Sequence, residues 1–83
     1  MKVVAESQIK SSFKGWGKHV YQLTNGEAWK QSIYKYDYHY AYMPKAKIWQ
    51  DGSRYYLEVE GMRDMVEVNR ASSSDVEEAE KEE

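Results

Sequence analysis

Two short turn sequences constrain the fold of this 83-residue chain more than any other feature. Asn25-Gly26 and Asp51-Gly52 each lie between stretches in which apolar and polar residues alternate. In such a setting Asn-Gly and Asp-Gly are the strongest short-range indications of a β-hairpin, because both accept the left-handed backbone of a tight turn. Val, Ile, Tyr and Trp are frequent in the body of the chain, and helical periodicity is absent there. The sequence therefore predicts an all-β domain.

The first hairpin is best explained by a three-residue loop. A loop of residues 24–26, with Gly26 in the left-handed conformation, pairs Tyr21 with Trp29 and Leu23 with Glu27. This register brings the large apolar side chains of both strands onto one face, which a two-residue loop would not do. The predicted buried face is Tyr21, Leu23, Trp29 and Ile33.

For the second hairpin we expect a two-residue loop of Asp51 and Gly52. That loop pairs Ile48 with Tyr55 and, on the opposite face, Trp49 with Arg54, where a cation–π contact would form. The predicted inner row is Ala46, Ile48, Tyr55, Leu57 and Val59, and the outer row is Lys47, Gln50, Arg54, Glu58 and Glu60. Pro44, which cannot donate a backbone hydrogen bond, marks the start of the strand 46–50.

Further short strands are predicted at both ends of the body. Residues 9–13 form the first strand, which ends at 15–17, where two glycines permit a bend or bulge, and residues 65–69 form the last. Five or six short strands with tight hairpins in residues 1–70 predict a small five- or six-stranded barrel or half-open barrel. Its expected type is Src-homology-3-like or oligonucleotide-binding-like.

Charge divides the chain into two segments. Residues 1–70 have 11 Lys and Arg against eight acids, whereas residues 71–83 have six acids and one lysine. The second segment has one branched aliphatic residue and no aromatic one, so we expect a disordered acidic tail. Ser74 and Glu77 match a capping box, which would permit a frayed helix. The tail would serve solubility, or it would mimic an acidic partner of the basic domain.

Residues 34–42 contain tyrosine at every second position, and we call these five residues the tyrosine ladder: Tyr34, Tyr36, Tyr38, Tyr40 and Tyr42. In an extended strand all five rings point to one side, with Lys35, Asp37, His39 and Ala41 on the other. A domain of about 65 residues cannot hide five such rings from water. Some rings are therefore expected to be exposed.

The parity of the ladder leaves two placements open. The preceding strand has its apolar face on odd residues up to Ile33, whereas the tyrosines are even. Either a bulge or loop near residues 32–34 resets the parity and several rings complete the core, or the ladder forms an exposed wall opposite the Trp29 face. The rings then pack at a barrel rim, bind a partner, or mark an edge strand that needs a partner strand.

The candidate binding site consists of the ladder with nearby Trp49, Lys45, Lys47 and Arg54. We expect a non-catalytic binding or adaptor module that contacts an unknown protein or peptide through it. The alternative is a single-stranded nucleic-acid binder that also uses Lys30, because stacking a base on an aromatic ring contributes about 1–3 kcal/mol. A small positive excess and the acidic tail weigh against nucleic acid. A third hypothesis is a protein that self-associates through an edge strand.

Other function classes find little support. The chain has no cysteine, which excludes disulfides and thiolate zinc sites, and no apolar run approaches the ~18 residues of a membrane span. The N-terminus lacks the apolar stretch of a signal peptide. His19 and His39 stand in no metal-ligand or nucleophile pattern, and no glycine-rich phosphate loop occurs. We expect no enzyme activity, no cofactor, no metal and no membrane partner.

Four segments resemble a family of small uncharacterised bacterial proteins. They are residues 12–16, 23–31, the ladder into Pro44-Lys45, and 56–61, which match the family pattern G-x-F-x-G-W, L-x-N-G-Q-x-W-x-Q, Y-x-Y-x-Y-x-P-K and Y-x-L-x-V-x-G. The resemblance covers about residues 6–70. Glu27 stands where glutamine is usual, and Ser12 where glycine is common. The resemblance implies a bacterial, cytoplasmic protein and a domain that also occurs appended to larger proteins, but it assigns no catalytic or binding residues.

Overall fold

The computed structural model describes residues 1–17 and 20–81, which form eight strands and one helix. All strand pairs are antiparallel. The prediction of an all-β fold is confirmed. The elements in chain order are β1 (Lys2–Gln8), β2 (Ser12–Trp16), β3 (Val20–Gln22), β4 (Ala28–Gln31), β5 (Asp37–Tyr42), β6 (Lys45–Asp51), β7 (Arg54–Val59), β8 (Val66–Arg70) and α1 (Ser73–Lys81).

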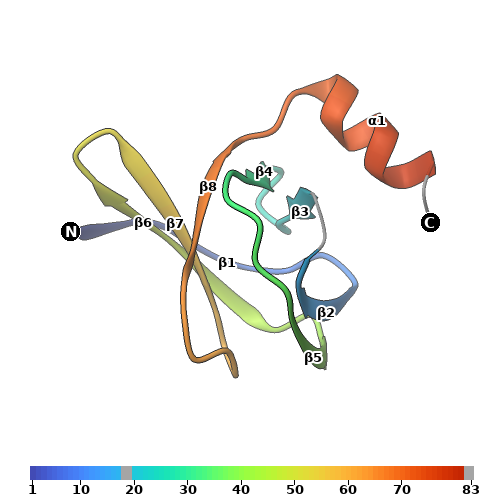
Figure 1. Ribbon diagram of the computed structural model, residues 1–83, viewed down its shortest axis with the longest axis horizontal. Helices are drawn as coiled ribbons and strands as arrows, with labels where there is room; N and C mark the ends of the chain where they lie inside the picture. Colours follow the sequence, from blue (N-terminus) through green and yellow to red (C-terminus); the bar gives the residue numbers. More distant parts are fainter. Residues whose placement is uncertain (18–19, 82–83) are drawn as a thin grey trace.

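The strands form two sheets rather than one barrel (Figure 1). The larger sheet has the order β1-β6-β7-β8-β4-β3, and β2 pairs only with β5 in a second, two-stranded sheet. Within the described residues no closed barrel is found, and the half-open form stays a prediction. The edge strands β1 and β3 meet only at one corner, through the bridge between Ile9 and Leu23. Because β3 has three residues, it is too short to pair along β1.

The predicted strand 9–13 is interrupted in the structure. Ser11 has a φ of +66°, in the left-handed region, and the chain turns there between β1 and β2. β2 therefore leaves the larger sheet and carries Phe13 and Trp16 over its inner face. Of the expected strand only residues 12 and 13 lie in a strand, and β1 over Lys2–Gln8 was not expected.

The first hairpin has the predicted loop and register. Tyr21 pairs with Trp29, the Leu23 amide donates to the carbonyl of Glu27 at 2.9 Å, and Gly26 has a φ of +92°. Tyr21, Leu23 and Trp29 are buried as expected. Ile33 is not, because β4 ends at Gln31 and the chain leaves the sheet before it.

The second hairpin has the predicted faces but a different register. Its loop is Gly52-Ser53, so Ile48 pairs with Leu57 and Trp49 with Tyr56. The predicted Trp49–Arg54 pair is therefore wrong. A loop that starts at Gly52 places glycine, with a φ of +62°, at the left-handed position, whereas an Asp-Gly type I′ turn would need a left-handed aspartate as well. The shift is two residues, which preserves the alternation of the two faces. Gln50 is the exception to the predicted rows, because it pairs with Tyr55 of the inner row.

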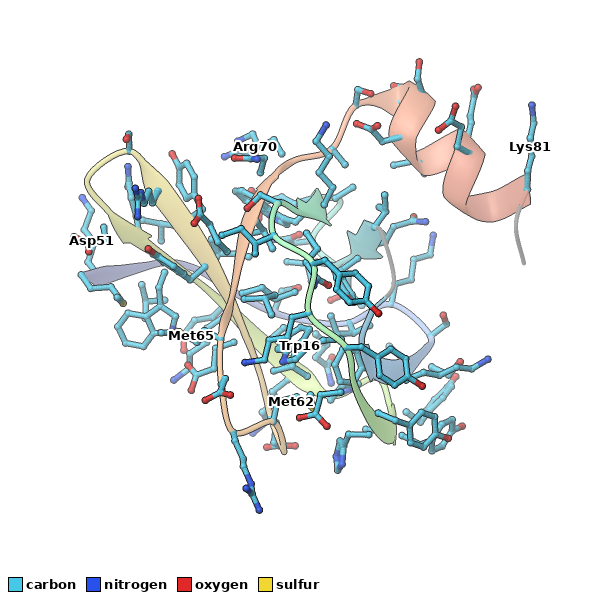
Figure 2. The ribbon with its side chains drawn as sticks, in the orientation of Figure 1. Trp16, Asp51, Met62, Met65, Arg70 and Lys81 are labelled. Atoms are coloured by element: carbon cyan, nitrogen blue, oxygen red, sulfur yellow. The ribbon has the colours of Figure 1, made fainter. Side chains whose placement is uncertain are left out.

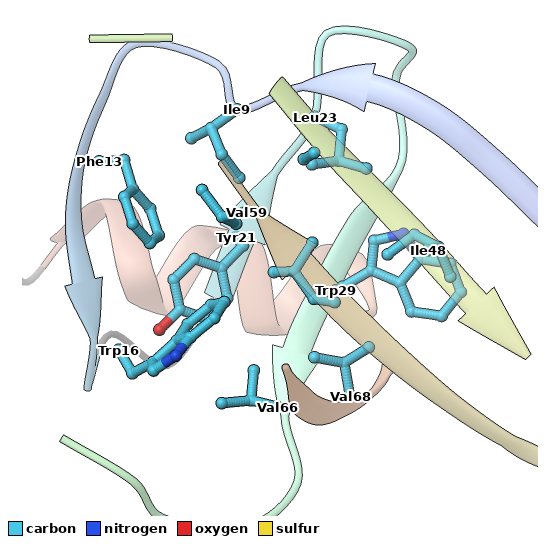
Figure 3. Close-up of a cluster of buried hydrophobic side chains, with 12 residues drawn as sticks. Ile9, Phe13, Trp16, Tyr21, Leu23, Trp29, Ile48, Val59, Val66 and Val68 are labelled. Carbon is cyan, nitrogen blue, oxygen red and sulfur yellow. The ribbon is translucent and has the colours of Figure 1, made fainter. Parts of the chain in front are cut away.

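The core lies between β2 and the inner face of the larger sheet (Figure 3). Phe13 and Trp16 from β2 meet Tyr21 from β3, with edge-on ring pairs at 5.6 Å for Phe13–Trp16 and 5.7 Å for Trp16–Tyr21. Such edge-to-face pairs are favourable beyond the area that they bury. The other buried hydrophobic side chains are Ile9, Val20, Leu23, Trp29, Ala46, Ile48, Leu57, Val59, Val66 and Val68.

Part of the acidic tail is helical in the structure, which differs from the predicted disorder. The N–H of Asp75 donates to Ser72 Oγ at 3.2 Å, and the Asp75 carboxylate accepts the Ser72 N–H at 2.9 Å. This capping box lies two residues before the expected one at Ser74. The Ala71 amide also donates to the carbonyl of Ala28 at 2.9 Å, so the helix begins at a point tied to β4. The cap and this tie reduce the cost of ordering α1.

Candidate functional site

The rings of the tyrosine ladder lie on the surface. Their exposed fractions are between 56% for Tyr40 and 83% for Tyr34, and none belongs to the core. In Figure 2 side chains stand away from the ribbon of β5 and of the loop before it. The prediction that some rings are exposed is confirmed, and the placement in which several rings complete the core is wrong. The core is filled by the side chains of β2 and the larger sheet instead.

The loop that leads into the ladder is held by one glutamine side chain. Gln31 Nε2 donates to the carbonyls of Ile33 and Lys35, each at 2.9 Å. Its Oε1 accepts hydrogen bonds from the Tyr21 hydroxyl at 3.0 Å and from the Gly17 amide at 3.3 Å. Both amide hydrogens and the oxygen of Gln31 are therefore used. The loop interrupts the alternation of buried and exposed residues between β4 and β5. The first of the two predicted placements required such a loop, but the rings lie on the surface and not in the core.

Two contacts join the ladder segment to the rest of the protein. The His39 ring lies over the backbone of Gly61, where a Cβ atom would stand 2.6 Å from Nε2. Tyr36 packs in the same way against Gly17, with a ring carbon 2.7 Å from the position of a Cβ atom. One ladder ring, Tyr36, therefore rests on the body of the protein at Gly17 and is still 67% exposed.

Gly15 allows β5 to approach β2 closely. A methyl group on Gly15 would overlap the carbonyl oxygen of Asp37 and lie 2.7 Å from the amide nitrogen of His39. The register shifts here, because Phe13 pairs with Ala41 but Gly15 pairs with Tyr38. The extra residue lies in β5, opposite Lys14, whereas the sequence placed a bend or bulge at residues 15–17 of the partner strand.

The bulge brings one lysine to the ladder that the sequence analysis missed. Lys14 of β2 lies opposite His39 and Tyr40 of β5, because at the bulge these two residues face a single residue of β2. Lys45 is also near, since it begins β6 directly after Met43 and Pro44. Both lysines are exposed, and within the part of the chain that the structure describes neither has an ion pair. Only the bulge pattern around Gly15 could have indicated Lys14.

Three other lysines near the expected site are in ion pairs. Lys35 Nζ lies 2.7 Å from Asp64 Oδ2, and this hydrogen bond holds the pKa of Asp64 below its ordinary value. The pairs of Lys30 and Lys47 are longer, at 3.5 Å to Asp75 and 3.8 Å to Glu6; neither lysine is therefore a free cation for a ligand.

Trp49 and Arg54 do not join the ladder. β6 begins beside the end of β5 and runs away from it, so both residues lie toward the far tip of the β6–β7 hairpin (Figure 1). Trp49 is half-buried, and its Nε1 donates to Glu58 Oε1 at 2.7 Å across the hairpin. Arg54 pairs with Asp51 next to the loop. The site predicted from the sequence is thus divided, and the ladder with Lys14 and Lys45 is the part that the fold brings together.

The described residues contain no group of three or more histidine or acidic side chains arranged to hold a metal ion. His39 is exposed, and His19 lies outside the described residues. A shallow groove lies beneath α1, away from the ladder, with Leu23, Ala28 and Val76 among its lining residues. Over residues 1–17 and 20–81, the helix is neither long nor apolar enough to cross a membrane.

Comparison of the chain with protein-family models, with curated proteins and with solved structures finds no significant match. The resemblance to small bacterial proteins therefore stays a prediction from the sequence. The functional argument rests on the geometry of the ladder.

Proposed function

We propose that this protein is a non-catalytic binding module that uses the tyrosine ladder to contact a protein or peptide. The observation that carries the proposal is the exposure of all five rings, each at least 56% accessible, on a chain whose core is complete without them. A tyrosine ring offers a large apolar area at a small cost in conformational entropy and a hydroxyl for hydrogen bonding. Tyrosine is accordingly enriched at the centre of protein interfaces.

The rigidity of the loop and strand supports the same function. Gln31 ties down the loop that carries Tyr34 and Tyr36, and β2 supports the strand that carries the other three rings. A surface that is already ordered loses little entropy when a partner binds. The exposed Lys14 and Lys45 add positive charge, so we expect the partner to present acidic residues beside an apolar or aromatic segment.

The test is a capture experiment with three forms of the full-length chain: wild type, a Tyr36→Ser/Tyr38→Ser/Tyr40→Ser variant, and a matched variant with phenylalanine at the same positions. We expect a protein that binds wild type and the phenylalanine form, resists nuclease, and is lost with the serine form, because the rings supply the contact area. Circular dichroism checks that each variant is folded. A partner retained equally by the serine form would contradict the proposal.

The second candidate is binding of single-stranded nucleic acid, which the position of Lys14 across from Tyr40 favours. Aromatic rings beside cations suit stacked bases and their phosphates. Lys30 and Lys47 contribute less than expected, because they are ion-paired, and Arg54 lies away from the ladder. This candidate predicts binding to a fluorescent oligonucleotide that weakens steeply with salt and tightens when residues 71–83 are removed. Binding insensitive to both changes would exclude it.

A further inference from the structure

We infer that the open edge of β5 pairs with the same edge of a second copy of this chain, so that two β2–β5 sheets become one four-stranded sheet. The inference goes beyond the proposed function, because the edge of a strand and the face that carries its side chains point in different directions. The smaller sheet consists only of β2 and β5 in the described structure. A two-stranded sheet is marginal by itself, and three or more strands are the usual requirement for stability.

The other strand edges in the described structure are protected. β1 has Lys2 and Glu6 along its edge and an irregular register between Val3 and Ala5. β3 has three residues, and α1 contacts it. Charged residues, bulges, short length and covering elements are the devices by which proteins prevent edge pairing.

The far side of β2 is also unavailable. Phe13, Gly15 and Trp16 are buried, and the Gly15 carbonyl accepts a hydrogen bond from the Tyr21 hydroxyl at 3.4 Å. β5 shares a register irregularity with β1, at its pairing with β2, and differs from these strands in other respects. Its residues are exposed or half-buried, no strand other than β2 pairs with it in the described structure, and Asp37 at its first position is its only acidic residue, with no lysine or arginine.

The backbone of β5 presents hydrogen-bonding groups to the open side. The Met43 amide donates to Ser11 in the direction of β2, and the Asp37 carbonyl and His39 amide face Gly15 of β2. Successive residues of a strand direct their backbone groups to opposite edges. Tyr38 lies between Asp37 and His39, and Tyr42 precedes Met43, so on either side of the bulge the N–H and C=O groups of Tyr38 and Tyr42 point away from β2, where a further strand can receive them.

Antiparallel pairing of two β5 strands fits these groups. Tyr38 of each copy would pair with Tyr42 of the other, with Tyr40 at the two-fold axis, in the isologous arrangement that closes a dimer. Both ladders then lie on one face, so dimerisation would double the proposed binding surface. After pairing, the small sheet has no open edge, which limits growth to two copies.

A single strand pair buries little area compared with the ~1,200 Å² of a stable interface, so we expect a weak dimer. Sedimentation equilibrium of the full chain, from micromolar to millimolar concentration, tests it. The weight-average mass should rise from 9.8 kDa toward twice that value. A mass that stays at the monomer value throughout, or one that grows past the dimer, would overturn the inference.

Two substitutions of Tyr42 distinguish the contribution of the strand edge to dimerisation from that of the tyrosine ring. Tyr42→Pro removes the outward N–H, whereas Tyr42→Ala removes the ring and keeps the N–H. We expect the alanine form to dimerise and the proline form to remain monomeric. Equal association of two folded variants would overturn the pairing. A monomeric wild type that still bound a partner through the ladder would overturn the dimer and leave the proposed function in place.

A distance measurement does not depend on the proline variant folding. The chain has no cysteine, so Ser12→Cys in β2 offers a unique site for a nitroxide label outside the ladder. In the four-stranded sheet the two β2 strands are three strand spacings apart, roughly 14 Å. Ser12 is opposite Tyr42, which pairs with Tyr38 of the other copy, so the two Ser12 positions are also offset by four residues, about 13 Å, and lie roughly 20 Å apart. Pulsed electron resonance at millimolar concentration should show a short intermolecular distance for this label. A label at Ser53→Cys, on the hairpin tip, should show only longer ones, and the absence of the short distance at Ser12→Cys would refute the pairing.

Discussion

The substitution Gly15→Ala tests whether close approach of β5 to β2 holds the ladder in place. Gly15 has a φ of +92°, and a methyl group there would overlap the Asp37 carbonyl and crowd the His39 amide. Gly26 is a matched control, because its φ is also +92° but a Cβ atom there has no neighbour within 4 Å. The two substitutions share the backbone strain and differ in the steric overlap.

The magnitude follows from these two terms. A left-handed backbone costs a residue with a Cβ atom about 1–2 kcal/mol, and this is the whole expected effect of Gly26→Ala. At Gly15 the overlap is with backbone atoms of the partner strand, which cannot rotate away, so overpacking adds about 1–3 kcal/mol. We therefore expect Gly15→Ala to lower the free energy of unfolding by roughly 2–5 kcal/mol. A chain of this length has about 4–12 kcal/mol in total, so the loss is large.

Urea unfolding followed by tryptophan fluorescence measures both variants, since Trp16 and Trp29 are buried and report the collapse of the core. Amide hydrogen exchange then shows which strands lose stability, and we expect protection to decrease first in β2 and β5. If Gly15→Ala costs no more than Gly26→Ala, the reasoning is refuted. It would mean that β2 and β5 separate without penalty, and that the ladder is not supported as described.

Two further predictions concern the supports of the site and of the helix. Gln31→Ala should free the loop of residues 32–36, because two carbonyls lose their donor; stability should fall by about 1–3 kcal/mol, with faster amide exchange in the loop. Unchanged exchange there would contradict this role. The pKa of Asp75 lies below its ordinary 3.8, chiefly because it accepts the Ser72 N–H, with Lys30 a smaller cause. Its support of α1 is thus present above pH ~4 and lost as pH falls through the lowered pKa. Helical circular dichroism should decrease there, and an Asp75→Asn variant that shows the same decrease would argue against it.

The hairpins show how far local information reaches. The loop at residues 24–26 was predictable because Gly26 and the alternation of Tyr21, Leu23 and Trp29 act within one hairpin. The register of the second hairpin was not, because shifting it by two residues leaves the same faces buried, and only the conformational preference of Gly52 against Asp51 separates the two loops. Similarly, the capping box lies at Ser72 rather than Ser74, next to the hydrogen bond between Ala71 and Ala28, which are distant in sequence.

The sequence by itself determined that the chain is all-β, where its first hairpin turns, and that five tyrosines cannot all be buried, because these properties follow from periodicity, turn preferences and size. Only the tertiary structure decided that β2 leaves the larger sheet and pairs with β5. It also decided that Lys14 rather than Trp49 and Arg54 accompanies the ladder, and that one edge of β5 stays open. These outcomes depend on contacts between residues far apart in the chain, such as Gly15 with Asp37. A local pattern cannot specify which of many possible distant partners a strand will meet.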